Sequence, residues 1–124
     1  MKLGQLLSVG IGGFIGSIIR YLLFININKI YSINFPFGTL FINILGCLAI
    51  GYFSALFTDT KNSMVQEFII IGILGGFTTF SAFGMETYEL IKNNFLGAAS
   101  LYVFASIICS IIAIHIGGKL HMTS

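Results

Sequence analysis

Charged residues are scarce in this chain, which has six Lys or Arg and four Asp or Glu among 124 residues. Charged residues make up about a quarter of an average soluble domain. Here 56% of the residues are hydrophobic, and the charged ones are separated by long uncharged stretches. The composition argues against a soluble domain and predicts a multi-pass protein of the inner (plasma) membrane.

Residues that often carry chemistry are also missing or isolated. There is no tryptophan, and the two cysteines, Cys47 and Cys109, belong to no CxxC motif or Cys/His cluster. We interpret both as packing residues. No basic cluster suggests nucleic acid, and no phosphate-binding glycine motif or intramembrane carboxylate pair is present. The sequence therefore predicts neither an enzyme nor a nucleic-acid-binding protein.

Four apolar stretches are long enough to cross a membrane, which takes about 20 residues. We expect helices over residues 3–27, 37–57, 65–91 and 95–118. The connecting segments are short, so residues 1–124 are expected to form a single four-helix transmembrane domain. The first stretch is too long for the apolar region of a cleaved signal peptide, and no cleavage site follows it.

The third stretch contains an unusual segment, residues 75–83, with the sequence GGFTTFSAF. Lipid cannot replace lost backbone hydrogen bonds, so a membrane helix normally keeps them internal. Glycine and short hydroxyl residues allow a chain to leave the helix and expose its carbonyl groups. Because such a break is tolerated only inside protein or beside a polar cavity, the segment predicts a broken third helix and an ion site.

Polar side chains recur along single faces of the second and fourth stretches. Thr39 and Asn43 are one helical turn apart, and Tyr102, Ser106 and Ser110 follow one another at the same spacing. Two interpretations stay open. Asn43 could lock two helices together or present its amide to a passing anion. Each serine could bond its own helix or line an ion path.

Neutral donors and phenyl rings suit a small hydrated anion, because they can replace part of its water shell. A phenyl ring has a positive edge, and Phe80 and Phe83 are neighbours if the chain is helical there. Carbonyls exposed near residues 75–78 favour a cation such as sodium instead. The candidate donors to the anion are one amide and four hydroxyls: Asn43, Ser81, Tyr102, Ser106 and Ser110.

Two charged residues lie within or beside the expected spans. Arg20 either extends toward the lipid headgroups or is a structural cation beside a water-filled entrance. Glu86 either belongs to a solvated face or stands in an aqueous vestibule.

Small residues at a spacing of four predict close helix packing in the first and third stretches. They are Gly4, Ser8, Gly12 and Gly16 in the first stretch, and Gly72 and Gly76 in the third.

The basic residues do not select an orientation in the membrane. Lys2, Lys61 and Lys119 lie on one expected side, and Arg20, Lys29 and Lys92 on the other. Positive charge in short loops normally fixes orientation. The tie predicts insertion in both orientations and an antiparallel homodimer. The alternative is a single orientation, in which Arg20 counts for less because it lies partly in the membrane.

Over essentially its whole length, the chain resembles the Fluc family of fluoride channels, also called CrcB. The resemblance rests on the four spans, the GGFTTFSAF segment, the GTLFIN segment at residues 38–43 and the Arg20-Tyr21 pair. It implies an antiparallel dual-topology homodimer in the lipid bilayer. Such a dimer would let fluoride leave the cytoplasm passively through two pores, around a central sodium ion.

The resemblance also implies roles for individual residues. Phe80 and Phe83 correspond to the pore phenylalanines, and Asn43 to the asparagine that reaches into the pore. One departure is Ala82, where the family usually has threonine, so any hydroxyl contact from that position is lost. The remaining correspondences are the sodium carbonyls of Gly75 and Thr78, the polar track of Tyr102, Ser106 and Ser110, and the vestibule or permeation-path positions Thr39 and Glu86.

Two other functions fit the sequence less well. A small proton-coupled multidrug exporter needs a carboxylate in its first span, where this chain has Arg20 instead. A helix-packing protein without transport activity would account for the glycines. It would explain neither the broken span nor the polar faces.

Overall fold

The computed structural model describes residues 2–31 and 34–124, and all regular structure within those ranges is helical. The first helix, α1, covers Leu3–Ile30, and α2 covers Phe37–Leu56. The third span, Ser63–Lys92, is divided into four pieces, and the last helix, α6, covers Leu96–Thr123. All four spans are long and apolar enough to cross a membrane, which confirms the four-span prediction. Helices α1 and α6 continue past the predicted ends at residues 27 and 118.

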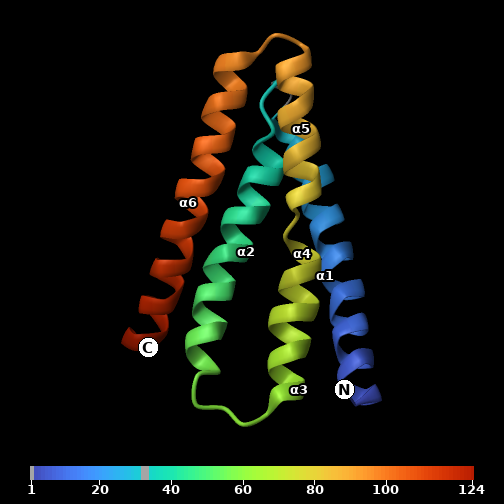
Figure 1. The fold of residues 1–124 in the computed structure, drawn as a ribbon, viewed down its shortest axis with the longest axis vertical. Helices are drawn as coiled ribbons and strands as arrows, with labels where there is room; N and C mark the ends of the chain where they lie inside the picture. Colours follow the sequence, from blue (N-terminus) through green and yellow to red (C-terminus); the bar gives the residue numbers. More distant parts are fainter. Residues whose placement is uncertain (1, 32–33) are drawn as a thin grey trace.

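The spans lie side by side, with α1 and α6 at the two edges in Figure 1 and with α2 and the third span between them. Both chain ends lie at the same end of the molecule, as expected for four spans. Helix α6 approaches the third span near the turn that joins the two and then leans away from it (Figure 1). It therefore packs mainly against α2.

The third span consists of α3 (Ser63–Gln66), the π-helix η1 (Glu67–Leu74), α4 (Gly75–Phe77) and α5 (Phe80–Lys92). The break between α4 and α5 is as predicted. The π-helical stretch was not predicted, because nothing in its apolar sequence distinguishes it from an ordinary α-helix. Such wider turns occur frequently at functional sites.

The stripe of small residues on α1 is a packing face, as predicted, and its partner is the third span. Gly12 and Gly16 are buried. A Cβ added at Gly12 would lie 2.5 Å from the carbonyl oxygen of Phe68 and 2.9 Å from the Cα of Gly72. Gly76 meets the α1 backbone in the same way. The first half of the third span is therefore held against α1 by direct backbone contact.

A second close backbone contact joins α2 to α6, and sequence analysis missed it. A Cβ on Gly51 would overlap the carbonyl oxygen of Ile114, and one on Gly117 would overlap that of Leu48. These two glycines are not in a GxxxG pair, but each lies four residues from an alanine, Gly51 before Ala55 and Gly117 after Ala113, and this weaker pattern could have indicated the contact. Their contact sets the distance between α2 and α6, and thus between Asn43 and the serines of α6.

Candidate functional site

The third span is broken at Thr78 and Thr79, whose backbones are extended, with φ/ψ of −81°/155° and −149°/118°. Gly75–Phe77 remain helical, so the break lies in the middle of the segment 75–83 and at the C-terminal end of residues 75–78, where exposed carbonyls were expected. Each threonine hydroxyl stabilises one helix end. Thr78 Oγ1 donates to the carbonyl of Leu74 at 3.0 Å, and Thr79 Oγ1 accepts from the N–H of Ala82 at 3.2 Å, as an N-cap does.

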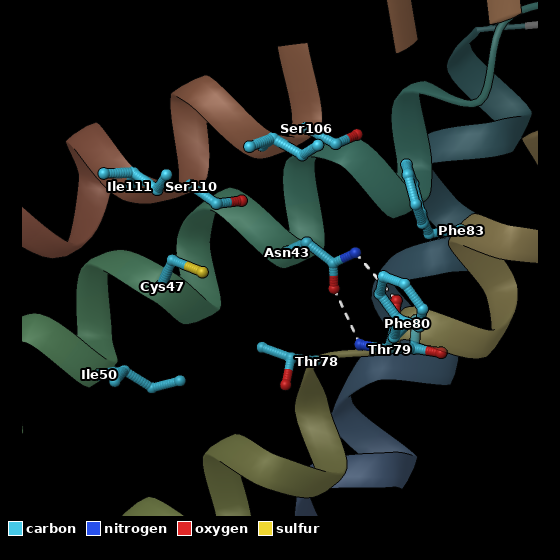
Figure 2. A pocket seen from close by; sticks show the side chains of 11 residues that line it. Asn43, Cys47, Ile50, Thr78, Thr79, Phe80, Phe83, Ser106, Ser110 and Ile111 are labelled. Carbon is cyan, nitrogen blue, oxygen red and sulfur yellow. Dashed lines mark hydrogen bonds between the residues drawn. The ribbon is translucent and has the colours of Figure 1, made fainter. Parts of the chain in front are cut away.

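Asn43 of α2 replaces the backbone partners that Thr79 loses at the break. Its Oδ1 accepts from the N–H of Thr79 at 2.8 Å, and its Nδ2 donates to the carbonyl of Thr79 at 3.0 Å (Figure 2). This contact bears out the interhelical interpretation of Asn43. An amide nitrogen carries two hydrogens. Donation of the second one to an anion therefore stays a prediction.

The break also frees carbonyl groups, among them those of Gly75 and Thr78, from their helical partners. In a continuous α-helix, each N–H donates to the carbonyl four residues earlier. The N–H of Thr79 donates to Asn43 rather than to the carbonyl of Gly75. The N–H of Ala82 donates to the Thr79 hydroxyl rather than to the carbonyl of Thr78. The carbonyls of Gly75 and Thr78 therefore lack their α-helical donors.

Arg20 of α1 reaches the same break. Its Nε donates to the carbonyl of Gly76 at 3.2 Å, and the side chain is half-buried. In a continuous helix, that carbonyl would accept from the N–H of Phe80. The contact supports a structural role for Arg20 at the break, and its place beside an entrance stays a prediction.

A pocket of about 360 Å³ opens beside the break (Figure 2). None of the described residues that line it is charged. Its polar groups are one amide, four hydroxyls and a thiol, which are the neutral kinds of donor expected for a small anion. The lining residues come from α2, from the third span and from α6: Asn43, Cys47, Ile50, Thr78, Thr79, Phe80, Phe83, Ser106, Ile107, Ser110 and Ile111.

Two phenylalanines form part of the pocket wall. The ring centroids of Phe80 and Phe83 are 5.4 Å apart, so the two rings are neighbours as the helical spacing predicts. Phe83 also packs on the ring of Tyr102, with 5.2 Å between centroids. Phe80 is 83% exposed in the single chain. One side of the pocket is therefore open.

The serines of α6 line the opposite wall. Ser106 is 8% exposed, and its hydroxyl is buried without a hydrogen-bond partner. Ser100 on the same helix does bond the carbonyl of Leu96, at 2.9 Å. Among the hydrogen bonds of the described residues, neither Ser106 nor Ser110 makes such a bond to its own helix. Leaving a buried hydroxyl unpaired costs about 1–3 kcal/mol of stability. The Ser106 hydroxyl would therefore gain from donating a hydrogen bond to a ligand.

Tyr102, the remaining residue of the polar track, lies outside the pocket and binds a carboxylate. Its hydroxyl donates to Oε2 of Glu86 at 2.7 Å, and Thr39 Oγ1 donates to Oε1 at 2.7 Å. Tyr102 and Thr39 are fully buried. Glu86 therefore joins α2, α5 and α6, and it also lines a second, polar pocket of about 280 Å³ with Glu89 and Asn93.

Ser81, by contrast, lies away from the pocket. The residue is exposed, and its hydroxyl is 3.2 Å from that of Thr79. A role for Ser81 in an ion path stays a prediction, and it requires residues of another chain to enclose the path beside Ser81. Sequence analysis assigned Cys47 to packing only, but Cys47 lines the pocket, and its spacing of four from Asn43 places it on the same face of α2.

We expect Tyr102→Phe and Thr39→Val each to destabilise the protein, because each removes one donor to the Glu86 carboxylate. Hydrogen bonds to charged groups contribute about 1.5–3 kcal/mol. Thermal unfolding of the detergent-purified variants measures the loss, with the exposed Tyr88→Phe as the control. Unchanged melting of both variants would mean that the Glu86 contacts carry no stability.

Comparison with known proteins gives one consistent family. A family model described as "CrcB-like protein, Camphor Resistance (CrcB)" matches residues 7–118. The chain is 43% identical over 119 residues to "Fluoride-specific ion channel FluC 1" of Nitrobacter hamburgensis, and the match covers 94% of each chain. It is 40% identical over 121 residues to "Fluoride-specific ion channel FluC" of Clostridium perfringens, with 96% of this chain and 94% of the relative covered.

Proposed function

The chain belongs to the CrcB family, and from that premise we propose that it is a fluoride-specific ion channel that lets fluoride leave the cytoplasm down its gradient. The observation that carries the proposal is the pocket beside the break, where the Ser106 hydroxyl is buried without a partner and no charged side chain is present. A small anion is the ligand that such neutral donors can hold.

Selectivity in this proposal comes from what replaces the water shell of fluoride. Fluoride is small and strongly hydrated, so it needs short contacts to several donors. The second amide hydrogen of Asn43 and the hydroxyls of Ser106 and Ser110 supply them on one side. Phe80 and Phe83 offer positive ring edges on the other. Tyr102, Thr39 and Glu86 continue the path toward the second pocket, and Arg20 attracts anions toward the break.

We further propose that two copies assemble in opposite orientations. Phe80 is 83% exposed at the middle of its span, and Gly75 beside it is exposed as well. A second copy would cover both and would close the open side of the pocket. The even split of basic residues allows both orientations. A protease site added at the C-terminus should be cut from both sides of oriented membranes, and cutting from one side only would contradict dual insertion.

The released carbonyls suggest what lies at the centre of such a dimer. Carbonyl oxygens of broken helices coordinate sodium in transporters. The carbonyls of Gly75 and Thr78, one pair from each copy, would provide four oxygens for a structural sodium ion. Replacing sodium with N-methyl-D-glucamine throughout purification should then lower thermal stability and fluoride efflux. Equal stability and efflux in both buffers would exclude the ion.

The proposed function is tested directly in liposomes. Purified protein should release trapped fluoride, followed with a fluoride electrode, while parallel vesicles loaded with chloride release little. Efflux should need no proton gradient. Absence of fluoride release, or equal release of chloride, would reject the proposal.

We expect Phe80→Ile and Phe83→Ile to reduce fluoride efflux by at least about tenfold, because isoleucine fills space but has no positive ring edge. Phe104→Ile on α6 is the matched control, since Phe104 is exposed and does not line the pocket. Efflux per protein is measured together with the size-exclusion profile. Full efflux in both pocket variants would show that the ring edges are dispensable.

A further inference from the structure

We infer that Cys47 is a further residue of the anion path and that its thiol is a binding site for soft mercuric ions, which block the channel. The inference rests on the proposed fluoride-channel function. It concerns a side chain that the motif at residues 75–83 does not include.

The position of Cys47 in the pocket carries the inference. Cys47 lies one helical turn beyond Asn43 on α2, so both side chains are on the same face of the helix. Cys47 lines the pocket together with Ser110 of α6. Figure 2 shows its sulfur turned into the space that the Ser110 hydroxyl also faces. The other cysteine, Cys109, is half-buried but does not line this pocket.

A second observation points to a ligand in this space. The Ser106 hydroxyl is buried without a partner in the same pocket, and Ser106 as a whole is only 8% exposed. Beyond Cys47 the wall of the pocket is aliphatic, formed by Ile50 and Ile111. The thiol is thus the last side chain of α2 in the pocket that can donate a hydrogen bond. An anion passing Ser110 meets it next.

The same position makes the thiol a target for soft metal ions, which prefer sulfur ligands. Neutral mercuric chloride can enter the uncharged pocket. Its reaction with the thiol forms an S–Hg bond and breaks the S–H bond and one Hg–Cl bond, which releases a proton and a chloride ion. No electron is transferred. The HgCl group then occupies the space between Asn43 and Ser110.

The test is fluoride efflux from proteoliposomes before and after treatment with mercuric chloride. We expect at least about a tenfold fall for the unmodified chain and for Cys109→Ala, with recovery after 2-mercaptoethanol. In Cys47→Ala, mercuric chloride should cause no further fall from whatever efflux that variant shows before treatment. A block that persists in Cys47→Ala, or that disappears in Cys109→Ala, would overturn the inference. So would a failure of mercuric chloride to slow the unmodified chain. Absence of fluoride efflux before treatment would instead reject the proposed function.

Cys47→Ser provides a second variant in case alanine weakens packing. Serine keeps a donor at this position but binds mercury poorly, so we expect the efflux that this variant shows before treatment to be insensitive to mercuric chloride. Mass spectrometry of the treated unmodified chain should place mercury on the peptide that contains Cys47. Mercury found only on Cys109, with efflux blocked, would contradict the assignment.

Discussion

Replacing Asn43 with leucine will abolish fluoride efflux and destabilise the protein. Leucine has a similar size but cannot pair with Thr79, whose N–H and carbonyl both bond the Asn43 side chain. Each buried backbone group left unpaired costs about 1–3 kcal/mol. Lipid offers no replacement partner. The break would therefore lose the contact that ties it to α2 and sets the position of Phe80.

The measurements are thermal unfolding in detergent and efflux from liposomes. Asn26→Leu on α1 is the matched control, because the Asn26 amide is exposed and bonds only its own helix, at the carbonyl of Leu22. Asn43→Asp separates the acceptor of the amide from its donors. It retains an acceptor for the Thr79 N–H but has no N–H to donate to Thr79 or to fluoride. Normal efflux in Asn43→Leu would show that the break keeps its geometry without the Asn43 hydrogen bonds.

Gly12→Ala should impair folding far more than Gly10→Ala on the same helix. The added methyl group at residue 12 would lie 2.5 Å from the carbonyl oxygen of Phe68 and 2.9 Å from the Cα of Gly72. Both are backbone atoms, so α1 and the third span would have to separate. Overpacking of this kind costs about 1–3 kcal/mol. The separation would also displace the carbonyl of Gly76 from Arg20.

Gly10 provides a closely matched comparison, since a Cβ there has no atom within 4 Å. Alanine also has a higher helix propensity than glycine. The yield of monodisperse protein and the melting temperature in detergent measure both effects. Equal yields and melting temperatures for the two variants would contradict the observed packing of α1 against η1.

The sequence predicted the features that depend on local properties of the chain. The four spans follow from long apolar stretches, and the break follows from glycines and hydroxyl residues where aliphatic ones are expected. The close-packing faces of the first and third spans follow from regular spacing of small residues. These signals need no information about neighbouring helices.

Other features could not be predicted because they depend on how the helices are rotated and how closely they approach. Asn43 had two possible partners, and only the position of α2 beside the break paired it with Thr79. Glu86 had two possible environments, and the packing of α2 and α6 gave it the hydroxyls of Thr39 and Tyr102.

The sequence by itself determined that this chain crosses the membrane four times, that its third span breaks, and which family it resembles. The tertiary structure alone decided which polar groups are satisfied within the chain and which are not. Asn43 and Glu86 are bonded inside the bundle, whereas the Ser106 hydroxyl and the carbonyls of Gly75 and Thr78 are left for other partners. The physical reason is that hydrophobicity and backbone freedom are properties of a segment, whereas satisfying a buried polar group requires a particular atom about 3 Å away on another helix.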